Sequence, residues 1–373
     1  MRRLAVIFLA FTLCGSALAQ VDVERRRTLT LQTGFAVGQS EEALGGFGYF
    51  WFNENNYPWT NTALRVIFSG VFVDSELSYF LPASTNTAVG IGGGGGFYIE
   101  SVTPYEKGER LSESQFYGDV ADIRFFINQT IPNPTPLPVN VRATYILSGA
   151  FYRKADTTRN FTMPDDFLTQ TALAELRLGG IEPGLTAKRG AELYVGADAN
   201  YRSGFDAFGP NGALFPAHNE YERLFASLGG KIPIAGSILF PRIAGGLGDH
   251  LDELSSWKIG GNLVGVEPYG YTLHGYYTRE FFASDFGLAN LDWAIPILDE
   301  RKVIGHLYGD WAVVKPVPPQ PSDWHNYFGV GAGVDFRAWW EFDLLLSYGY
   351  GFNAVRNGDQ GGHEIGLALE KKF

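Results

Sequence analysis

The sequence predicts an all-β protein, a transmembrane antiparallel β-barrel of about 16 strands, from three observations. Stretches of alternating apolar and polar residues recur along the chain. After the N-terminal run, no segment is long and apolar enough for a membrane helix, and the connections between the stretches alternate in length. A pattern of period two indicates a strand whose two faces meet different surroundings. Strands that cross lipid must close into a barrel, because an open edge leaves backbone groups unpaired.

The N-terminus has the order of a secretory signal peptide. Two arginines follow Met1, an apolar run from Leu4 to Cys14 comes next, and Ala17-Leu-Ala19 provides a small-residue cleavage site. We therefore expect a signal peptide at residues 1–19 and an outer-membrane β-barrel domain at residues 20–373. Cys14 is the only cysteine, so the barrel domain is expected to contain no disulfide, reactive thiol or cysteine metal ligand.

The expected strands follow one another without a linker or an internal repeat. They are expected to begin near residues 27, 43, 62, 75, 87, 115, 139, 170, 190, 221, 236, 254, 286, 302, 325, 339 and 362. This is one start too many for the even number that bacterial barrels have. Because the stretch Leu64–Phe80 is either one long strand or two, it is the expected source of the surplus.

The clearest strand is Trp339–Phe352, which has aromatic residues at both ends of one face and leucines in the middle. That order is typical of a strand that crosses a bilayer between two aromatic girdles. Its opposite face is polar or small, and the polar faces of similar stretches carry charges of both signs. These patterns favour a water-filled or plugged lumen. The run Gly92–Gly96 is expected in a strand crowded by bulky neighbours or a plug, with a flexible gate as the alternative.

Connection lengths give the orientation. Counting back from Phe373, the connections are expected to be long, very short, long, short and very long. Their approximate positions are Asn353–Gln360, Arg337–Trp339, Lys315–Asn326, Asp299–Lys302 and Gly265–Asp285. Bacterial barrels have short periplasmic turns and longer outer loops, so the C-terminus is expected on the periplasmic side.

Three segments of the C-terminal third carry a family resemblance. They are Ile259-Gly-Gly-Asn262, Leu273-His-Gly-Tyr276 and Asn290–Pro296. In this order they resemble the Omp85 superfamily, the barrel family of BamA, TamA and the D15 surface antigens. The resemblance implies that the long loop is the sixth outer loop and folds inward. The Gly329-x-Gly331-x-Gly333 strand and the terminal Phe373 also look like the family's last strands, and Phe373 would then be a C-terminal assembly signal.

The resemblance also implies roles for individual residues. His274, Gly275 and Tyr276 match the family's loop motif, in which an arginine stands where this chain has His274. That arginine is inferred to reach into the lumen and pair with acidic groups on late strands. A neutral histidine binds more weakly and its charge varies with pH, and Arg279 is a nearby substitute. The expected lumen acceptors are Asp292, Asp335, Glu341 and Asp343.

For function, the resemblance implies a barrel that assists insertion or translocation of proteins or lipids at the outer membrane. Nothing before residue 27 matches a POTRA domain, the family's periplasmic module, which puts the usual route in doubt. We expect outer-membrane lipid and the barrel-assembly machinery as partners, with a separate periplasmic module or client protein. The alternative is a passive pore or small-solute transporter of an unrelated barrel family; a structural surface protein and a soluble β protein also stay open.

Composition and motifs argue against other classes. The formal net charge of −11 makes nucleic acid an unexpected partner. The six histidines show no metal-ligand spacing, and no nucleophile elbow is present. Asp249-His250 and Asp323-Trp-His325 are expected in solvated loops. Glu341 and Asp343 fit electrostatic lining better than glycosidase chemistry. We therefore expect no enzymatic activity, no cofactor and no metal.

Overall fold

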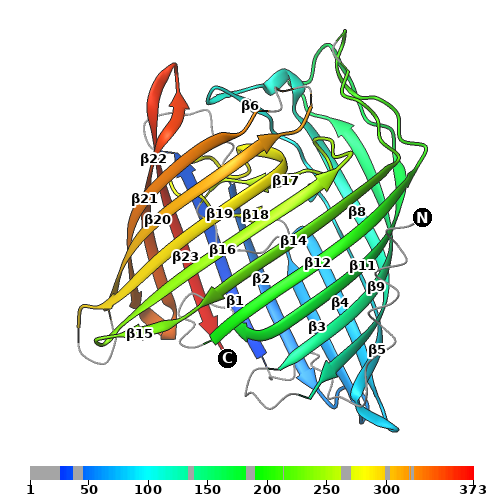
Figure 1. Ribbon diagram of the computed structural model, residues 1–373, viewed down its shortest axis with the longest axis vertical. Coiled ribbons are helices and arrows are strands. Elements are labelled where there is room, and N and C mark those ends of the chain that lie inside the picture. The colour runs from blue at the N-terminus through cyan, green and yellow to red at the C-terminus, as the bar shows by residue number, and fades with distance from the viewer. Residues whose placement is uncertain are drawn as a thin grey trace.

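The computed structural model describes residues 26–36, 45–132, 138–181, 190–212, 214–261, 270–298, 303–318, 320 and 323–373. Within them, long antiparallel strands form a closed barrel of sixteen strands (Figure 1), which confirms the predicted fold class. The barrel strands are β1 (Arg26–Ala36), β2 (Gly45–Asn55), β3 (Thr62–Ser69), β4 (Phe72–Leu81), β5 (Ser84–Gly96), β8 (Phe116–Ile131), β9 (Val139–Lys154), β11 (Phe167–Ile181), β12 (Gly190–Ser203), β14 (Glu220–Gly230), β16 (Ser237–Asp249), β19 (Phe281–Pro296), β20 (Val303–Pro316), β21 (His325–Arg337), β22 (Asp343–Arg356) and β23 (Asp359–Lys372).

Shorter elements lie in the connections. They are β6 (Tyr105–Glu106), β7 (Glu109–Arg110), the 3-10 helix η2 (Ser112–Ser114), β10 (Phe161–Thr162), β13 (Gly209–Pro210), β15 (Ile232–Ile234), β17 (Trp257–Ile259), β18 (Gly270–Tyr271) and η4 (Trp339–Glu341). Each barrel strand pairs with the next, and β1 pairs with β23 from Thr28↔Lys372 to Ala36↔Glu364. This last pairing joins the two ends of the sheet, so the barrel has no free edge.

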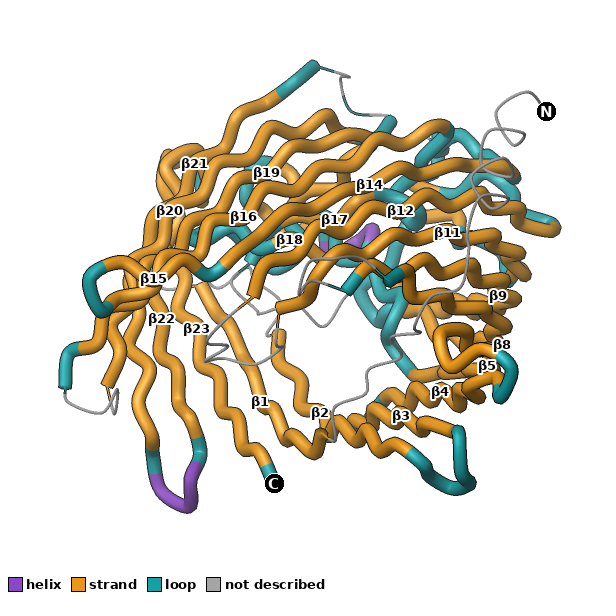
Figure 2. Tube along the Cα trace, turned by 60° about the horizontal axis from the view of Figure 1, so that its bottom comes forward, coloured by secondary structure: helices purple, strands orange, loops and turns teal. Residues whose placement is uncertain are grey.

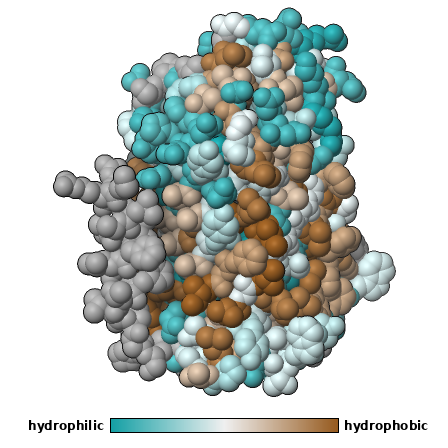
Figure 3. All heavy atoms as spheres, turned by 90° about the vertical axis from the view of Figure 1, so that its right-hand side faces the viewer, coloured by the Kyte–Doolittle hydropathy of each residue, from teal (hydrophilic) through white to brown (hydrophobic). Residues whose placement is uncertain are grey.

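The alternation of side chains separates a lipid-type face from a lumen face. On β22, Leu345, Ser347 and Gly349 are buried while Leu346 and Tyr348 are exposed. Figure 3 shows the result on one side of the molecule, where apolar residues cover the middle and lower part and polar residues cover the loops above. An apolar outer band beside a polar interior is the arrangement of a barrel in a bilayer.

The two ends of the barrel differ in their connections. The end that carries the C-terminus has compact turns such as 82–83 and 338–342, whereas the opposite end has the connections 97–115, 204–219 and 250–280. We call these the short-turn end and the long-loop end. Among the described residues, no helix is long and apolar enough to span a membrane. The predicted signal peptide, residues 1–19, and the turn 299–302 lie outside the described residues.

Three details of the sequence prediction were wrong. Leu64–Phe80 contains two strands, β3 and β4, so it is not the source of the surplus start. The surplus is the start near residue 254, which falls in the connection 250–280 beside the short strand β17. The last hairpin has no long loop, because β22 and β23 continue to a tight turn at Asn357-Gly358, where both φ angles are positive.

A smaller correction concerns the strand predicted at Trp339–Phe352. Trp340 has a φ of 56° within η4, and the strand begins only at Asp343. The alternation from Leu344 to Phe352 is as predicted. The turn that precedes it was not visible, because aromatic residues continue the same period-two pattern through it.

Candidate functional site

The connection 250–280, which we call loop 6, is the sixth connection at the long-loop end and joins β16 to β19. Seen from the short-turn end, β17 and β18 lie within the ring of barrel strands (Figure 2). β17 pairs antiparallel with β19 and parallel with β18. β17 pairs with Phe281–Ala283, the part of β19 beyond its ladder with β16, so it continues the wall at the long-loop end. From there loop 6 folds inward, as the sequence predicted, because its tip contacts lumen-facing glycines of β21, β22 and β23. Asn262 of the sequence motif lies outside the described residues.

Two glycines bring the two arms of loop 6 together. Gly260 and Gly261 have φ angles of 127° and 83°, which side chains other than glycine rarely tolerate. A β-carbon on Gly260 would lie 2.4 Å from the carbonyl oxygen of Tyr277, and one on Gly261 would lie 2.8 Å from the Cα of Thr278. The Gly-Gly pair is thus required for the close approach of the outgoing and returning arms.

The tip of loop 6 is bound to the wall by His274. The backbone N–H of His274 donates to Asp310 Oδ2 on β20 at 2.8 Å, and its ring Nδ1 lies 2.6 Å from the same oxygen. The imidazole also stacks on Tyr308, with ring centroids 4.3 Å apart and planes at 11°. Asn290 of β19 donates to the other oxygen of Asp310 at 2.7 Å. A buried carboxylate with several donors holds the loop far better than an exposed ion pair would.

Beneath this tip, part of the wall consists of glycines. Four glycines on β21, β22 and β23 form what we call the glycine floor: Gly329, Gly349, Gly351 and Gly362. A β-carbon on any of them would lie 2.5–2.8 Å from a backbone atom of His274 or Gly275, or from the ring of Tyr276. Real β-carbons do not approach other atoms so closely. The floor therefore lets the loop backbone lie directly on the strands.

Gly275 itself fits only as glycine. Its φ is 84°, and a β-carbon there would lie 2.0 Å from the backbone nitrogen of Gly351. The next residue, Tyr276, is fully buried. Its hydroxyl donates to the carbonyl of Phe328 at 3.1 Å and accepts from the N–H of Asn353 at 3.3 Å. Burial raises the pKa of this Tyr276 hydroxyl well above its ordinary value, so it stays a neutral donor.

The returning arm of loop 6 is held by a second, larger contact. Glu280 and Arg356 form two hydrogen bonds of 2.8 Å each, and both side chains are buried. The guanidinium of Arg356 lies 3.6 Å from the ring centroid of Tyr277, and the N–H of Tyr277 donates to Glu280 at 2.7 Å. The ring of Tyr105, from β6 in the connection 97–115, lies 4.9 Å from that of Tyr277. Two connections of the long-loop end and β22 thus converge on one buried ion pair.

The structure brings together three of the residues predicted for the loop motif, His274, Gly275 and Tyr276. Arg279 lies elsewhere on the returning arm. It has a φ of 59°, it is buried so that its pKa is lowered, and its favourable charge partner is Glu100. Arg279 therefore does not take the place of His274 at Asp310.

The predicted lumen acceptors have other neighbours. Asp292 lies 2.9 Å from His306, Asp343 lies 3.5 Å from Arg337, Glu341 is in the turn η4 at the short-turn end, and Asp335 is buried on β21. The acceptor of His274 is Asp310, which the sequence analysis did not nominate. Asp310 lies opposite Asn290 on β19 and Gly329 on β21 in the strand ladders. Both of these residues belong to segments that carry the family resemblance. Knowledge of the strand register could therefore have identified Asp310.

A second polar cluster lies on the opposite part of the wall, from β3 to β9. We call it the ion-pair wall: Arg65, Asp74, Glu76, Arg124 and Arg142. Arg65 lies 3.2 Å from both carboxylates, Arg142 lies 2.8 Å from Glu76, and Arg124 pairs with Asp74. Arg124 and Arg142 come from β8 and β9, so they cross β5 to reach β4. They can do so because β5 contributes glycines there, and the Cβ position of Gly94 is 3.1 Å from Asp74 and 3.3 Å from Arg124.

Comparisons with known proteins find the fold but no sequence relative. No family model matches the chain, and no curated protein matches it. Among solved structures, BamA from Haemophilus ducreyi lacking POTRA domains 1–3 has a TM-score of 0.60 at 11% identity, over 93% of this chain and 71% of that chain.

Two further structures are similar. CdiB from Escherichia coli has a TM-score of 0.59 at 12% identity, over 94% of this chain and 64% of that one. CdiB from Acinetobacter baumannii has a TM-score of 0.57 at 12% identity, over 95% of this chain and 61% of that one. This chain thus spans less than two thirds of either CdiB chain. The protein has the fold of a sixteen-strand outer-membrane β-barrel, and its architecture is similar to that of the BamA and CdiB barrels.

Proposed function

We propose that this protein is an Omp85-like barrel of the bacterial outer membrane, and that it assists insertion or translocation of proteins or lipids there. Loop 6 acts as a lock that holds the lumen closed. The observation that carries the proposal is the seating of His274, Gly275 and Tyr276 on the glycine floor, with Asp310 as the acceptor. The motif that resembles the family's loop is the segment that touches the wall, which supports the proposal.

Loop 6 is bound to the wall by contacts that a passive channel would not need. The tip uses backbone contacts over four glycines, and the returning arm uses a buried ion pair. Removing a loop held in this way exposes charged and polar groups that are satisfied only when it is docked. We infer that the docked loop is the resting state, that the short-turn end faces the periplasm, and that no catalytic step takes part.

Planar-bilayer recordings of the purified protein test this proposal against a passive pore. The lock predicts a low, irregular conductance for the unmodified protein and a larger, steadier one for His274→Ala. His274→Ala removes a charge-assisted hydrogen bond and a ring contact, together worth about 2 kcal/mol. A large, steady conductance that is the same with and without the substitution would favour the small-solute pore instead.

Gel mobility supplies the second readout. If loop 6 supports the barrel, His274→Ala lowers the temperature at which the folded, fast-migrating form converts to the unfolded form. If neither conductance nor that temperature changes, the motif has no locking role in this chain.

A further inference from the structure

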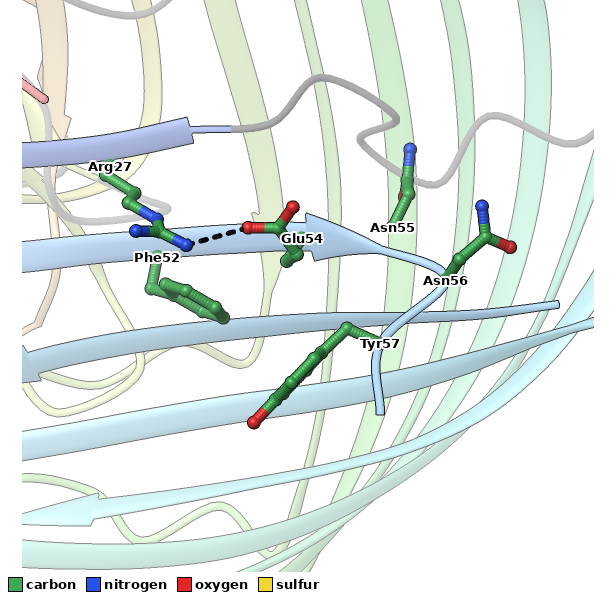
Figure 4. A pocket seen from close by; sticks show the side chains of 6 residues that line it. All are labelled: Arg27, Phe52, Glu54, Asn55, Asn56 and Tyr57. Carbon is green, nitrogen blue, oxygen red and sulfur yellow. Dashed lines mark hydrogen bonds and ion pairs between the residues drawn. The ribbon is translucent and has the colours of Figure 1, made fainter. Parts of the chain in front are cut away.

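The short-turn end carries a pocket that is separate from loop 6. Figure 4 shows it at the ends of β1 and β2, where Arg27 and Glu54 face each other and the rings of Phe52 and Tyr57 lie beside them. Its volume is about 380 Å³, and we call it the rim pocket. Its lining residues are Arg27, Phe52, Glu54, Asn55, Asn56 and Tyr57.

The charged pair of the rim pocket is on the lipid side of the wall. Thr28 and Thr30 are buried toward the interior, whereas Leu31, on the same face of β1 as Arg27, is 42% exposed. Arg27 pairs in register with Phe52 on β2. Further along that face of β2, the ring of Phe50 lies 6.3 Å from that of the terminal Phe373. An Arg–Glu pair at the edge of an apolar band lies where lipid headgroups meet the protein.

The charged groups of the pocket are of both signs and are within reach of a ligand, because the side chain of Arg27 is 39% exposed and that of Glu54 is 22% exposed. Arg27 Nη2 lies 3.1 Å from Glu54 Oε2, and both side chains are partly exposed. A guanidinium has five donors, and its planar fork matches the oxygens of a phosphate.

Aromatic rings complete the site. The guanidinium of Arg27 lies 5.3 Å from the ring centroid of Phe52, and Phe52 packs edge-on against Tyr57 at 6.1 Å. Tyr57 is 49% exposed, so its ring is open to a ligand. The turn is fixed beside it, because the N–H of Asn61 donates to Asn56 Oδ1 at 3.3 Å. An ammonium group near Glu54 would meet a carboxylate and an aromatic face together.

We propose that the rim pocket binds the headgroup of phosphatidylethanolamine from the membrane leaflet at the short-turn end. The phosphate binds Arg27, and the ammonium binds Glu54 and the Tyr57 ring. A zwitterion satisfies both members of the pair and leaves no net charge, which an anionic headgroup cannot do. Lys371, a further cation on this face, lies 5.5 Å from the Phe342 ring centroid and 5.2 Å from that of Phe373. The proposal requires the barrel to sit in a membrane, but it does not depend on the lock in loop 6.

The experiment is native mass spectrometry of the full-length protein released from detergent micelles. Phosphatidylethanolamine and phosphatidylglycerol with the same acyl chains are added as competing probes. We expect phosphatidylethanolamine to be retained preferentially. We also expect Arg27→Gln or Glu54→Gln to weaken its binding about fivefold to tenfold, the usual cost of one charge-assisted hydrogen bond. Equal retention of both lipids, preference for phosphatidylglycerol, or unchanged binding by the variants would overturn the proposal.

Three controls make the result specific. Arg177→Gln removes an arginine that also pairs with a glutamate, Glu192, near the short-turn end. Arg177 shares the lumen face of β11 with Glu175, so phosphatidylethanolamine binding should stay unchanged. Glycerophosphoethanolamine, which has no acyl chains, should not compete; effective competition would overturn the assignment to a membrane lipid. If a charge variant fails to give the heat-modifiable folded form, Tyr57→Leu keeps the ion pair and should weaken binding about threefold through the lost cation–π contact.

Discussion

The glycine floor and the ion-pair wall use the same residue for opposite purposes. On β21 to β23, the missing side chains make room for a backbone, that of the loop 6 tip. On β5, the missing side chains make room for long side chains, because Arg124 and Arg142 pass over the strand to reach Asp74 and Glu76. The glycines of the floor allow loop 6 to dock on the wall, whereas the glycines of β5 allow side chains of neighbouring strands to form ion pairs across it.

The comparison teaches how to interpret glycine on the lumen face of a barrel strand. The glycine floor has almost no room for a larger residue, because a Cβ atom on any of its four glycines would lie within 2.8 Å of loop 6. At Gly94 on β5, a Cβ atom would lie 3.0 Å from the carbonyl oxygen of Val73 and 3.1 and 3.3 Å from the ends of the Asp74 and Arg124 side chains. These neighbours need to shift by only a few tenths of an ångström. We therefore expect substitutions at the two sites to differ in both size and readout.

The largest expected effect is at the base of loop 6. Arg356→Met leaves Glu280 buried without its cation, which should weaken docking of the loop by about 3–5 kcal/mol. Protease cleavage within loop 6 of the folded barrel would report this as faster digestion. The double variant Arg356→Met/Glu280→Gln removes both charges and should recover part of the protection. Unchanged digestion of the single variant would contradict a role for this pair in holding the loop.

A smaller effect is expected at the tip. Gly275→Ala adds a methyl group against the Gly351 backbone at a positive φ, which should cost the docked loop about 2–3 kcal/mol. The matched control is Gly358→Ala in the β22–β23 turn, where φ is 85° but nothing lies within 4 Å of the Cβ position. That control carries only the conformational cost of about 1 kcal/mol. Equal sensitivity of loop 6 to protease in the two variants would remove the steric argument for the floor.

The smallest effect is expected on the ion-pair wall. Gly94→Ala should lower barrel stability by no more than about 1 kcal/mol, because Asp74 and Arg124 can move aside and the Val73 carbonyl oxygen, at 3.0 Å, needs to shift by only a few tenths of an ångström. It should leave loop 6 as resistant to protease as in the unmodified protein. A thermal melt followed by gel mobility measures the first expectation, and digestion measures the second. Faster digestion of loop 6 in Gly94→Ala would mean that the ion-pair wall and the glycine floor are coupled. It would contradict the expected difference between the two sites.

The sequence predicted the class of fold because period-two patterning records which face of a strand meets lipid. The same patterning placed most strand starts close to their observed positions, since side-chain environment changes where a strand begins. It failed at residue 254, where loop 6 is itself apolar because Trp257 and Ile259 pack inside the barrel. A buried loop and a barrel strand have similar composition, so periodicity could not separate them.

The site was predictable only in part, for a related reason. His274, Gly275 and Tyr276 could be found as a contiguous motif. Asp310 and Arg356 could not, because their roles depend on which strands are neighbours and how the strands are registered. No local feature distinguishes Asp310, which binds the loop, from Asp292, which contacts His306 instead.

The glycine floor spans the last three strands, and Gly362 of β23 lies under the carbonyl of Gly275. β23 is also the strand that closes the cylinder against β1. Loop 6 and one side of the β1–β23 junction are thus joined through the glycine floor. If β23 moves away from β1, it must either carry the tip of loop 6 with it or break the contact at Gly362, so separation of these two strands and release of the loop are coupled.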